Sequence, residues 1–189
     1  MIGQIKVPVI VPYFKAPDLI AKCQRHMINS IGVAPEFMIR DNSEDNILYT
    51  RAINEKLRLC RDREFALILT QDCFVSPDCL WHLVEHMRRN PRCGIAAPVQ
   101  LGDSYGSGVT WGGSLEAWPA GRHIVNKLEE LQRVGPQLTY WANGACFLVR
   151  MNMVNEIGLM VQDVMQTIVK LAVPLRTVPQ FGTNYRQCK

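Results

Sequence analysis

Short runs of mostly apolar residues alternate with amphipathic stretches along the first half of the chain. Residues 5–11 and 65–69 are apolar at almost every position, a pattern typical of strands buried on both faces of a parallel sheet. Residues 37–39 and 94–99 show the same pattern more briefly. We therefore expect these four segments to be strands of one sheet.

The stretches between these strands have helical spacing. One helix is expected to begin at Pro17 and Asp18, and another to cover residues 47–59. A third begins at Ser76-Pro77-Asp78, where a hydroxyl cap, a proline and a carboxylate suit a helix start, and runs to about Arg89. This alternation predicts a single α/β domain with a Rossmann-like, open, twisted, mostly parallel sheet flanked by helices.

The composition of the sequence changes after Gly102. Glycine and aromatic residues become frequent, and only short strands are expected, at residues 109–112 and 140–149. We therefore treat residues 1–100 and 101–160 as two halves of the domain.

The composition of the chain limits which binding partners and which cellular compartment we expect. The 189 residues carry 21 Lys and Arg against 17 Asp and Glu, a net charge of +4, and the basic residues are scattered. This balance predicts no nucleic-acid partner and is a weak indication of anionic ones, such as nucleotides or, by peripheral association, a phospholipid membrane surface. The seven cysteines form no C-x-x-C pair, and neither a membrane span nor a secretion signal is evident, so we expect a cytoplasmic location.

Polar residues follow three of the predicted strands. Pro12-Tyr13 ends the first strand, Asp41 and Asp45 follow the second, and Asp72 follows the third. Ligands of open α/β sheets bind at the carboxyl ends of the strands, where Asp41 or Asp45 could accept hydrogen bonds from a base or a ribose. Asp72 is placed to hold a divalent cation, Mg or Mn, that bridges a diphosphate. The alternative is that these aspartates only cap the following helices.

Six segments in a fixed order carry a family resemblance over roughly residues 5–160. They read V-I-V-P-Y-F (9–14), I-R-D-N-S-E-D-N (39–46), Y-T-R-A-I-N-E-K-L (49–57), L-I-L-T-Q-D-C-F-V-S-P-D-C-L (67–80), W-A-N-G-A-C-F-L-V-R (141–150) and E-I-G-L-M (156–160). With this set the chain resembles the family 2 glycosyltransferases with the GT-A fold, especially their rhamnosyltransferase-like members.

The resemblance implies a nucleotide site and a metal ligand. Asp41 would contact the nucleoside base, and Asp72 matches the second Asp of the family's D-x-D metal motif, whereas Thr70 stands in place of the first. Arg40 and Arg51 are weaker candidates for phosphate contact. The nucleotide-binding candidates are Pro12, Tyr13, Asp41, Ser43 and Arg51. The segment that would close over the donor sugar contains Trp141, Asn143, Gly144 and Ala145.

Aromatic faces suit the apolar faces of sugar rings, so Trp111, Trp118 and Trp141 are candidates for sugar stacking. Packing in the core is an equally good interpretation of each. Trp111 is followed by two glycines, Gly112 and Gly113, which favour a site at Trp111.

The implied activity is transfer of a sugar, with inversion, from a nucleoside-diphosphate sugar of the UDP or dTDP type to a hydroxyl of a saccharide or lipid-linked acceptor. Residues 1–100 would then bind the donor, and residues 101–160 would close around donor and acceptor. The alternative is a non-catalytic domain that binds a nucleotide sugar without turnover.

The resemblance stops in a divergent tail, residues 161–189. The family has a carboxylate-rich stretch here that supplies the general base, but Asp163 is the only acid after Glu156. One hypothesis is a shifted reading frame: GTG ATG CAG ACT ATA GTT can encode residues 164–169, and from its third base it reads Asp-Ala-Asp-Tyr-Ser. On this hypothesis the activity is lost or altered.

Two other motifs point to hydrolases. G-D-S-Y-G matches a nucleophile elbow around Ser104, but the following segment is a poor helix and His123 lies too close in sequence. H-L-V-E-H matches an inverted zinc-peptidase motif, but His82, Glu85 and His86 fall on the solvent face of the predicted helix. Both readings are less favoured than the transferase.

Overall fold

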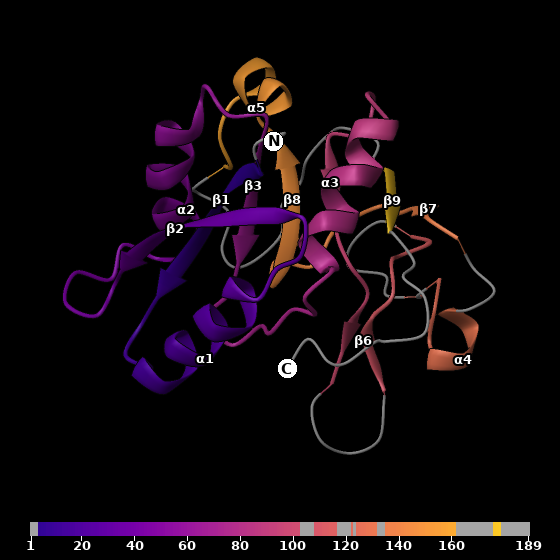
Figure 1. Ribbon diagram of the computed structural model, residues 1–189, viewed down its shortest axis with the longest axis horizontal. Coiled ribbons are helices and arrows are strands. Elements are labelled where there is room, and N and C mark those ends of the chain that lie inside the picture. Colours follow the sequence, from indigo (N-terminus) through magenta and orange to yellow (C-terminus); the bar gives the residue numbers. More distant parts are fainter. Residues whose placement is uncertain are drawn as a thin grey trace.

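The computed structural model describes residues 4–102, 108–116, 122, 124–131, 135–161 and 176–178. At its centre is a five-stranded sheet with the order β2-β1-β3-β8-β4. The strands are β1 (Ile5–Tyr13), β2 (Val33–Asp41), β3 (Phe65–Leu69), β4 (Ile95–Ala96) and β8 (Cys146–Arg150). β1 pairs in parallel with β2 and β3, while β8 runs antiparallel to β3 and β4 (Figure 1). The expected open, mostly parallel α/β sheet is confirmed.

The long pairing between β1 and β2 fixes where these strands end. Their register runs without a break from Ile5 opposite Val33 to Tyr13 opposite Asp41. β2 is therefore longer than the predicted segment 37–39. Its sequence V-A-P-E-F-M-I-R-D lacks a continuous apolar run because β2 is an edge strand and most of its side chains are only half-buried. An edge strand also tolerates a proline, whose missing N–H does not interrupt the interior of the sheet.

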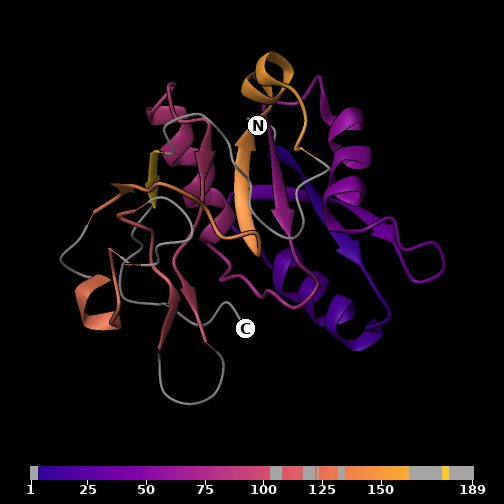
Figure 2. The same cartoon turned by 180° about the vertical axis from the view of Figure 1, so that it is seen from behind.

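Helices cover both faces of the sheet. α1 (Pro17–Ile28) and α3 (Cys79–Arg89) pack on one face, and α2 (Tyr49–Leu57), the 3-10 turn η1 (Arg58–Cys60) and α5 (Met151–Ile157) pack on the other. Figures 1 and 2 show this arrangement from opposite sides. The sheet is thus buried on both faces, which explains why its central strands are apolar throughout.

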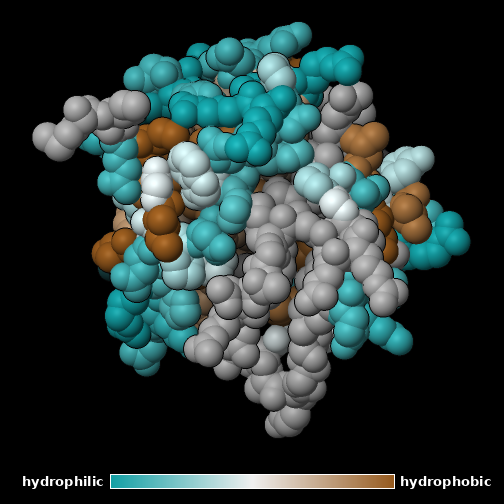
Figure 3. Space-filling model, turned by 45° about the vertical axis from the view of Figure 1, so that its right-hand side comes forward, coloured by the Kyte–Doolittle hydropathy of each residue, from teal (hydrophilic) through white to brown (hydrophobic). Residues whose placement is uncertain are grey.

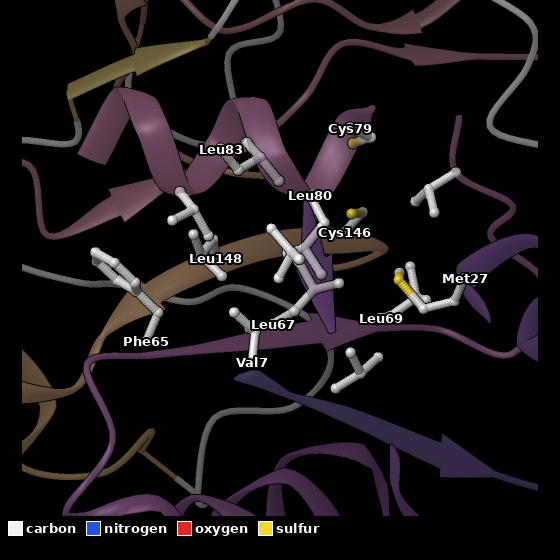
Figure 4. Packing of buried hydrophobic residues seen from close by; sticks show 14 of the residues in the cluster. Val7, Met27, Phe65, Leu67, Leu69, Cys79, Leu80, Leu83, Cys146 and Leu148 are labelled. Carbon is white, nitrogen blue, oxygen red and sulfur yellow. The ribbon is translucent and has the colours of Figure 1, made fainter. Parts of the chain in front are cut away.

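Alternate residues of each strand supply the two cores. Leu67 of β3 and Leu148 of β8 face α3, whose Leu80 and Leu83 point toward them (Figure 4). The intervening Ile68 faces the opposite core with α2 and α5. These leucines and the isoleucine are at most 1% exposed, so each contributes about 1.5–3 kcal/mol through burial.

The start of α3 differs from the prediction. The helix begins at Cys79, three residues after the expected cap Ser76. The Ser76 hydroxyl donates to the Asp78 carboxylate at 2.7 Å instead of accepting from a backbone N–H of the first turn. The cap prediction was therefore wrong: Asp78 occupies the cap position, and no side chain bonds to the first turn.

Short elements complete the domain beside α3. β5 (Gln100–Leu101) pairs with β6 (Val109–Trp111), β7 (Gln137–Leu138) pairs with β9 (Arg176–Val178), and α4 covers Leu128–Leu131. Figure 1 shows β7, β9 and α4 to the right of α3 and β6 below it, on the side of the molecule away from β2.

The view in Figure 3 shows a largely hydrophilic surface on which the apolar side chains lie in separate small groups. Among the described residues, Ile28, Leu48 and Val161 are each 66% exposed. No helix in the described part of the chain is both long and apolar enough to cross a membrane.

Candidate functional site

The ends of β1 and β2 are joined through their loops. Tyr13 and Asp41 are register partners at the last position of the pairing. Beyond them, the Asn42 N–H donates to the Tyr13 carbonyl at 2.8 Å, and the Lys15 N–H donates to the Ser43 hydroxyl at 3.2 Å. The two loops therefore form one continuous rim.

A side-chain amide joins the loop after β3 to the same rim. Gln71 Oε1 accepts from the Phe14 N–H at 2.7 Å, and Gln71 Nε2 donates to the Phe14 carbonyl at 3.2 Å. These residues are 57 positions apart in the sequence. The amide thus pairs with both backbone groups of Phe14, as a neighbouring strand would.

The turn before β8 reaches this edge as well, because β8 runs in the opposite direction to β3. The Thr70 N–H donates to the Ala145 carbonyl at 2.9 Å, and the Thr70 hydroxyl lies 3.4 Å from the same oxygen. The Tyr49 hydroxyl donates to the Gly144 carbonyl, and the Ala145 N–H donates to Asn143 Oδ1 at 3.0 Å. Four segments that are distant in sequence therefore meet at one edge of the sheet.

Most of the predicted site residues lie at this edge. Gln71 and Phe14 also lie here but escaped the sequence analysis, because a single glutamine or aromatic residue carries no motif of its own. The predicted residues that the structure brings together at this edge are Pro12, Tyr13, Asp41, Ser43, Asp72, Asn143, Gly144 and Ala145.

Charged groups hold the loop after β2 in place. Arg40 donates to both carboxylate oxygens of Asp45 at 2.8 Å and to Glu55 at 3.1 Å. The hydrogen bond from Arg40 lowers the pKa of Asp45. Hydrogen bonds from Ser43, first from its hydroxyl and then from its backbone N–H, lower the pKa of Asp41. Asp41 is therefore an ionised, exposed acceptor, whereas Arg40 is engaged by two carboxylates rather than directed to a phosphate.

Two solved structures share this architecture. The mannosyltransferase PcManGT from Pyrobaculum calidifontis, in complex with GDP-Man and Mn2+, matches with a TM-score of 0.54 at 14% identity, over 86% of this chain and 49% of its own. TarS 1–349 from S. aureus, in complex with UDP, matches with a TM-score of 0.53 at 14% identity, over 84% of this chain and 51% of its own. This chain has the GT-A fold.

The resemblance found in the sequence is thus supported at the level of the fold. A comparison with protein-family models finds no match, and neither does a comparison with curated proteins. The chain spans about half the length of the solved GT-A chains that it matches.

The position of the D-x-D motif in this GT-A fold holds a single carboxylate. Asp72 is exposed at the rim, while the hydroxyl of Thr70 faces the Ala145 carbonyl. Among the described residues, no group of three or more His, Cys, Asp or Glu side chains is arranged to hold a metal ion. Magnesium-type ions are commonly bound by one or two carboxylates together with substrate phosphates and water. Asp72 therefore fits a divalent metal as a single protein ligand, with a diphosphate binding the same ion.

Arg51 and Tyr49 occupy the first turn of α2, at the same edge. Arg51 is exposed and makes no ion pair with a described residue, which leaves its charge available to an anion. Tyr49 is half-buried, and desolvation of its hydroxyl raises the pKa of that group. Tyr49 therefore acts as a hydrogen-bond donor that ties α2 to the turn before β8.

Trp111 and Gly112 lie within the packing rather than on the rim. Trp111 is 0% exposed, and its ring centroid lies 6.0 Å from that of Trp141. A Cβ on Gly112 would lie 2.1 Å from the Val125 carbonyl oxygen, so the close approach of two backbones requires glycine here. The alternative interpretation of Trp111, packing in the core, therefore agrees with its position in the structure.

The H-x-x-E-H residues of α3 are used in surface contacts. His82 lies 3.5 Å from Asp78, and Glu85 forms an ion pair with Arg89 at 2.7 Å. Partial burial lowers the pKa of His86. The described residues form no zinc site at this position.

Several sequence candidates lie outside the described residues: Ser104, Trp118, His123, Asp163 and the segment proposed to be frame-shifted.

Six cysteines are described; all are buried, and none forms a disulfide with another described residue. Burial raises the pKa of Cys23 to about 12. Hydrogen bonds with Cys73 and Cys79, followed by burial, raise the pKa of Cys146. The thiols of Cys23 and Cys146 are therefore protonated parts of the core and not nucleophiles.

Proposed function

We propose that this chain binds a nucleoside-diphosphate sugar at the rim described above and transfers the sugar, with inversion, to a hydroxyl of a saccharide or lipid-linked acceptor. One observation carries the proposal: the segments around Tyr13, Asp41, Asp72 and Ala145 meet at the carboxyl edge of a GT-A sheet. A ligand bound at this edge can contact all four at once.

The base would bind beside Tyr13 and Phe14. Phe14 is 44% exposed, and the Lys15 ammonium lies 5.3 Å from the centre of its ring. An exposed aromatic face next to a cation suits a flat base that leads to a negatively charged diphosphate. Asp41, which the Ser43 hydrogen bonds hold in place, would accept a hydrogen bond from the base or the ribose.

The diphosphate would bind between Asp72 and Arg51. Asp72 would share a divalent metal, Mg or Mn, with the phosphate oxygens, and the metal would neutralise charge on the leaving diphosphate. Arg51 would add a fixed positive charge from the first turn of α2. Because the protein supplies one carboxylate, we expect the metal to bind tightly only together with the nucleotide.

The sugar would lie against the turn at 143–145 and Trp141. The chain returns to this region after α5, since Met160 packs in the same apolar cluster as Tyr49 and Trp141. Asn54, which is 0% exposed, anchors this return by hydrogen bonds to both backbone groups of Met160. On the resemblance, we take Asp163, which follows Met160 in the sequence, as the candidate for the general base.

Titration calorimetry with UDP, dTDP and GDP, each with and without Mn2+, tests the proposal. We expect at least one nucleotide to bind, more tightly with Mn2+, and Asp72→Asn to remove the effect of Mn2+. Asp62→Asn, a change of an exposed carboxylate that precedes β3, is the matched control and should change nothing. Wild-type protein that binds none of the three nucleotides would refute the proposed function.

A second candidate function is nucleotide-sugar binding without turnover. It is favoured by Thr70, whose hydroxyl faces the Ala145 carbonyl where the D-x-D motif would have a first carboxylate. Incubation with UDP- and GDP-sugars separates the two functions: release of UDP or GDP supports transfer or donor hydrolysis, whereas binding without release supports the second.

A further inference from the structure

Gln71 stands between the two ends of the proposed nucleotide site. The residue before it, Thr70, is bound through its backbone N–H to Ala145, and the residue after it, Asp72, is exposed. The side chain of Gln71 itself holds Phe14 by two hydrogen bonds of 2.7 and 3.2 Å. One side-chain amide therefore connects the aromatic end of the site to the carboxylate end.

The turn held by Gln71 needs contacts from outside itself. Lys15 has a φ of 43°, in the left-handed region that residues other than glycine rarely adopt. The Lys15 N–H is held by Ser43 on one side, and Phe14 is held by Gln71 on the other. The pairing of β1 with β2 ends at Tyr13. Without the amide, Phe14 would lose both backbone hydrogen bonds that the structure shows for it among the described residues.

We propose that Gln71 is a positioning residue that sets the separation between the base-binding end, at Phe14, and the metal-binding end, at Asp72. This role rests on the proposed function. A nucleoside diphosphate touches both ends, so its affinity depends on their being held at the right separation before binding. A ligand that touches one end alone does not depend on that separation.

The two classes of ligand therefore distinguish positioning from general stability. In Gln71→Met, which keeps the length of the side chain and removes both hydrogen bonds, we expect the affinity for Mn2+ with UDP or GDP to fall by at least about tenfold. The nucleotide that binds the wild type more tightly is the one to use. The affinity for Mn2+ with pyrophosphate, which occupies the metal end alone, should change by less than about twofold.

Gln24→Met makes the same chemical change on α1, in a side chain for which the structure shows no hydrogen bond to a described residue, and should leave both affinities unchanged. Thermal unfolding of both variants separates a loss of folded protein from a loss of positioning. Amide exchange followed by NMR gives a measurement without nucleotide: the Phe14 N–H should exchange faster in Gln71→Met, while that of Ile10, inside the sheet, should not.

The outcomes separate the two proposals. If the wild type binds nucleotide and Gln71→Met binds it equally well, the positioning role is overturned and the proposed function stands. If both ligands lose affinity to the same extent, Gln71 acts only through overall stability, and the positioning role is again overturned. If the wild type binds no nucleotide, both proposals fail, and faster exchange at Phe14 then reports a purely structural contact.

Discussion

Replacing Asn54 by alanine tests how the chain is anchored after α5. The Asn54 side chain donates to the Met160 carbonyl at 2.8 Å and accepts from the Met160 N–H at 3.1 Å, and it is 0% exposed. A typical hydrogen bond contributes about 0.5–1.5 kcal/mol net, and a buried group left without a partner costs about 1–3 kcal/mol. Because Met160 is only half-buried, water can reach part of its backbone once the amide is gone.

These contributions predict that Asn54→Ala lowers the free energy of unfolding by about 2–4 kcal/mol. For a chain of this size, that loss corresponds to a Tm lower by about 4–16 °C. Urea unfolding followed by tryptophan fluorescence gives the free energy directly, provided that the slope with denaturant stays the same.

Asn155→Ala is the matched control. Asn155 also donates from its amide to a backbone carbonyl, that of Arg61 at 2.9 Å, but on an exposed part of α5. Its loss should cost about 0.5 kcal/mol or less, as is usual for surface positions. If Asn54→Ala is no less stable than Asn155→Ala, the two hydrogen bonds to Met160 do not anchor the chain after α5.

Three further results are expected. Gly112→Ala should cost about 1–3 kcal/mol, because its Cβ would meet the Val125 carbonyl, whereas Gly108→Ala has open space and should be nearly neutral; equal thermal stability of the two variants would contradict the close approach. The lowered pKa of Asp41 gives a stabilisation that is complete above its ordinary value of 3.8 and is lost as the pH falls through its lower folded value. Asp41→Asn should therefore weaken the acid dependence of urea unfolding below about pH 5, and an unchanged acid limb would rule out the contribution. Sequencing the gene tests the frame-shift hypothesis for residues 164–169, which fails if no single-base shift restores a D-x-D-Y-like reading.

The sequence predicted the strands β1 and β3 well, whereas β8 (Cys146–Arg150) is shorter than the predicted segment 140–149 and begins later. For β3, the predicted segment 65–69 and the observed bounds Phe65–Leu69 agree, because a strand covered on both faces is apolar at every position. The end of β2 at Asp41 was also close to the expectation, although its beginning was not, since the half-exposed edge strand has no continuous apolar pattern. A local pattern of apolar residues indicates burial, and strands at the centre of a sheet are the most buried.

The amino-acid sequence by itself determined the α/β class, the main helices and the carboxylates at the strand ends, since each depends on neighbours a few positions away. Only the tertiary structure decided that Gln71 holds Phe14, that Arg40 is engaged by Asp45 and Glu55, and that Trp111 is core. Such contacts depend on which backbone groups meet when distant segments pack. A hydrogen bond across 57 residues leaves no periodicity in the chain, because its partners are brought together by the fold and not by their spacing.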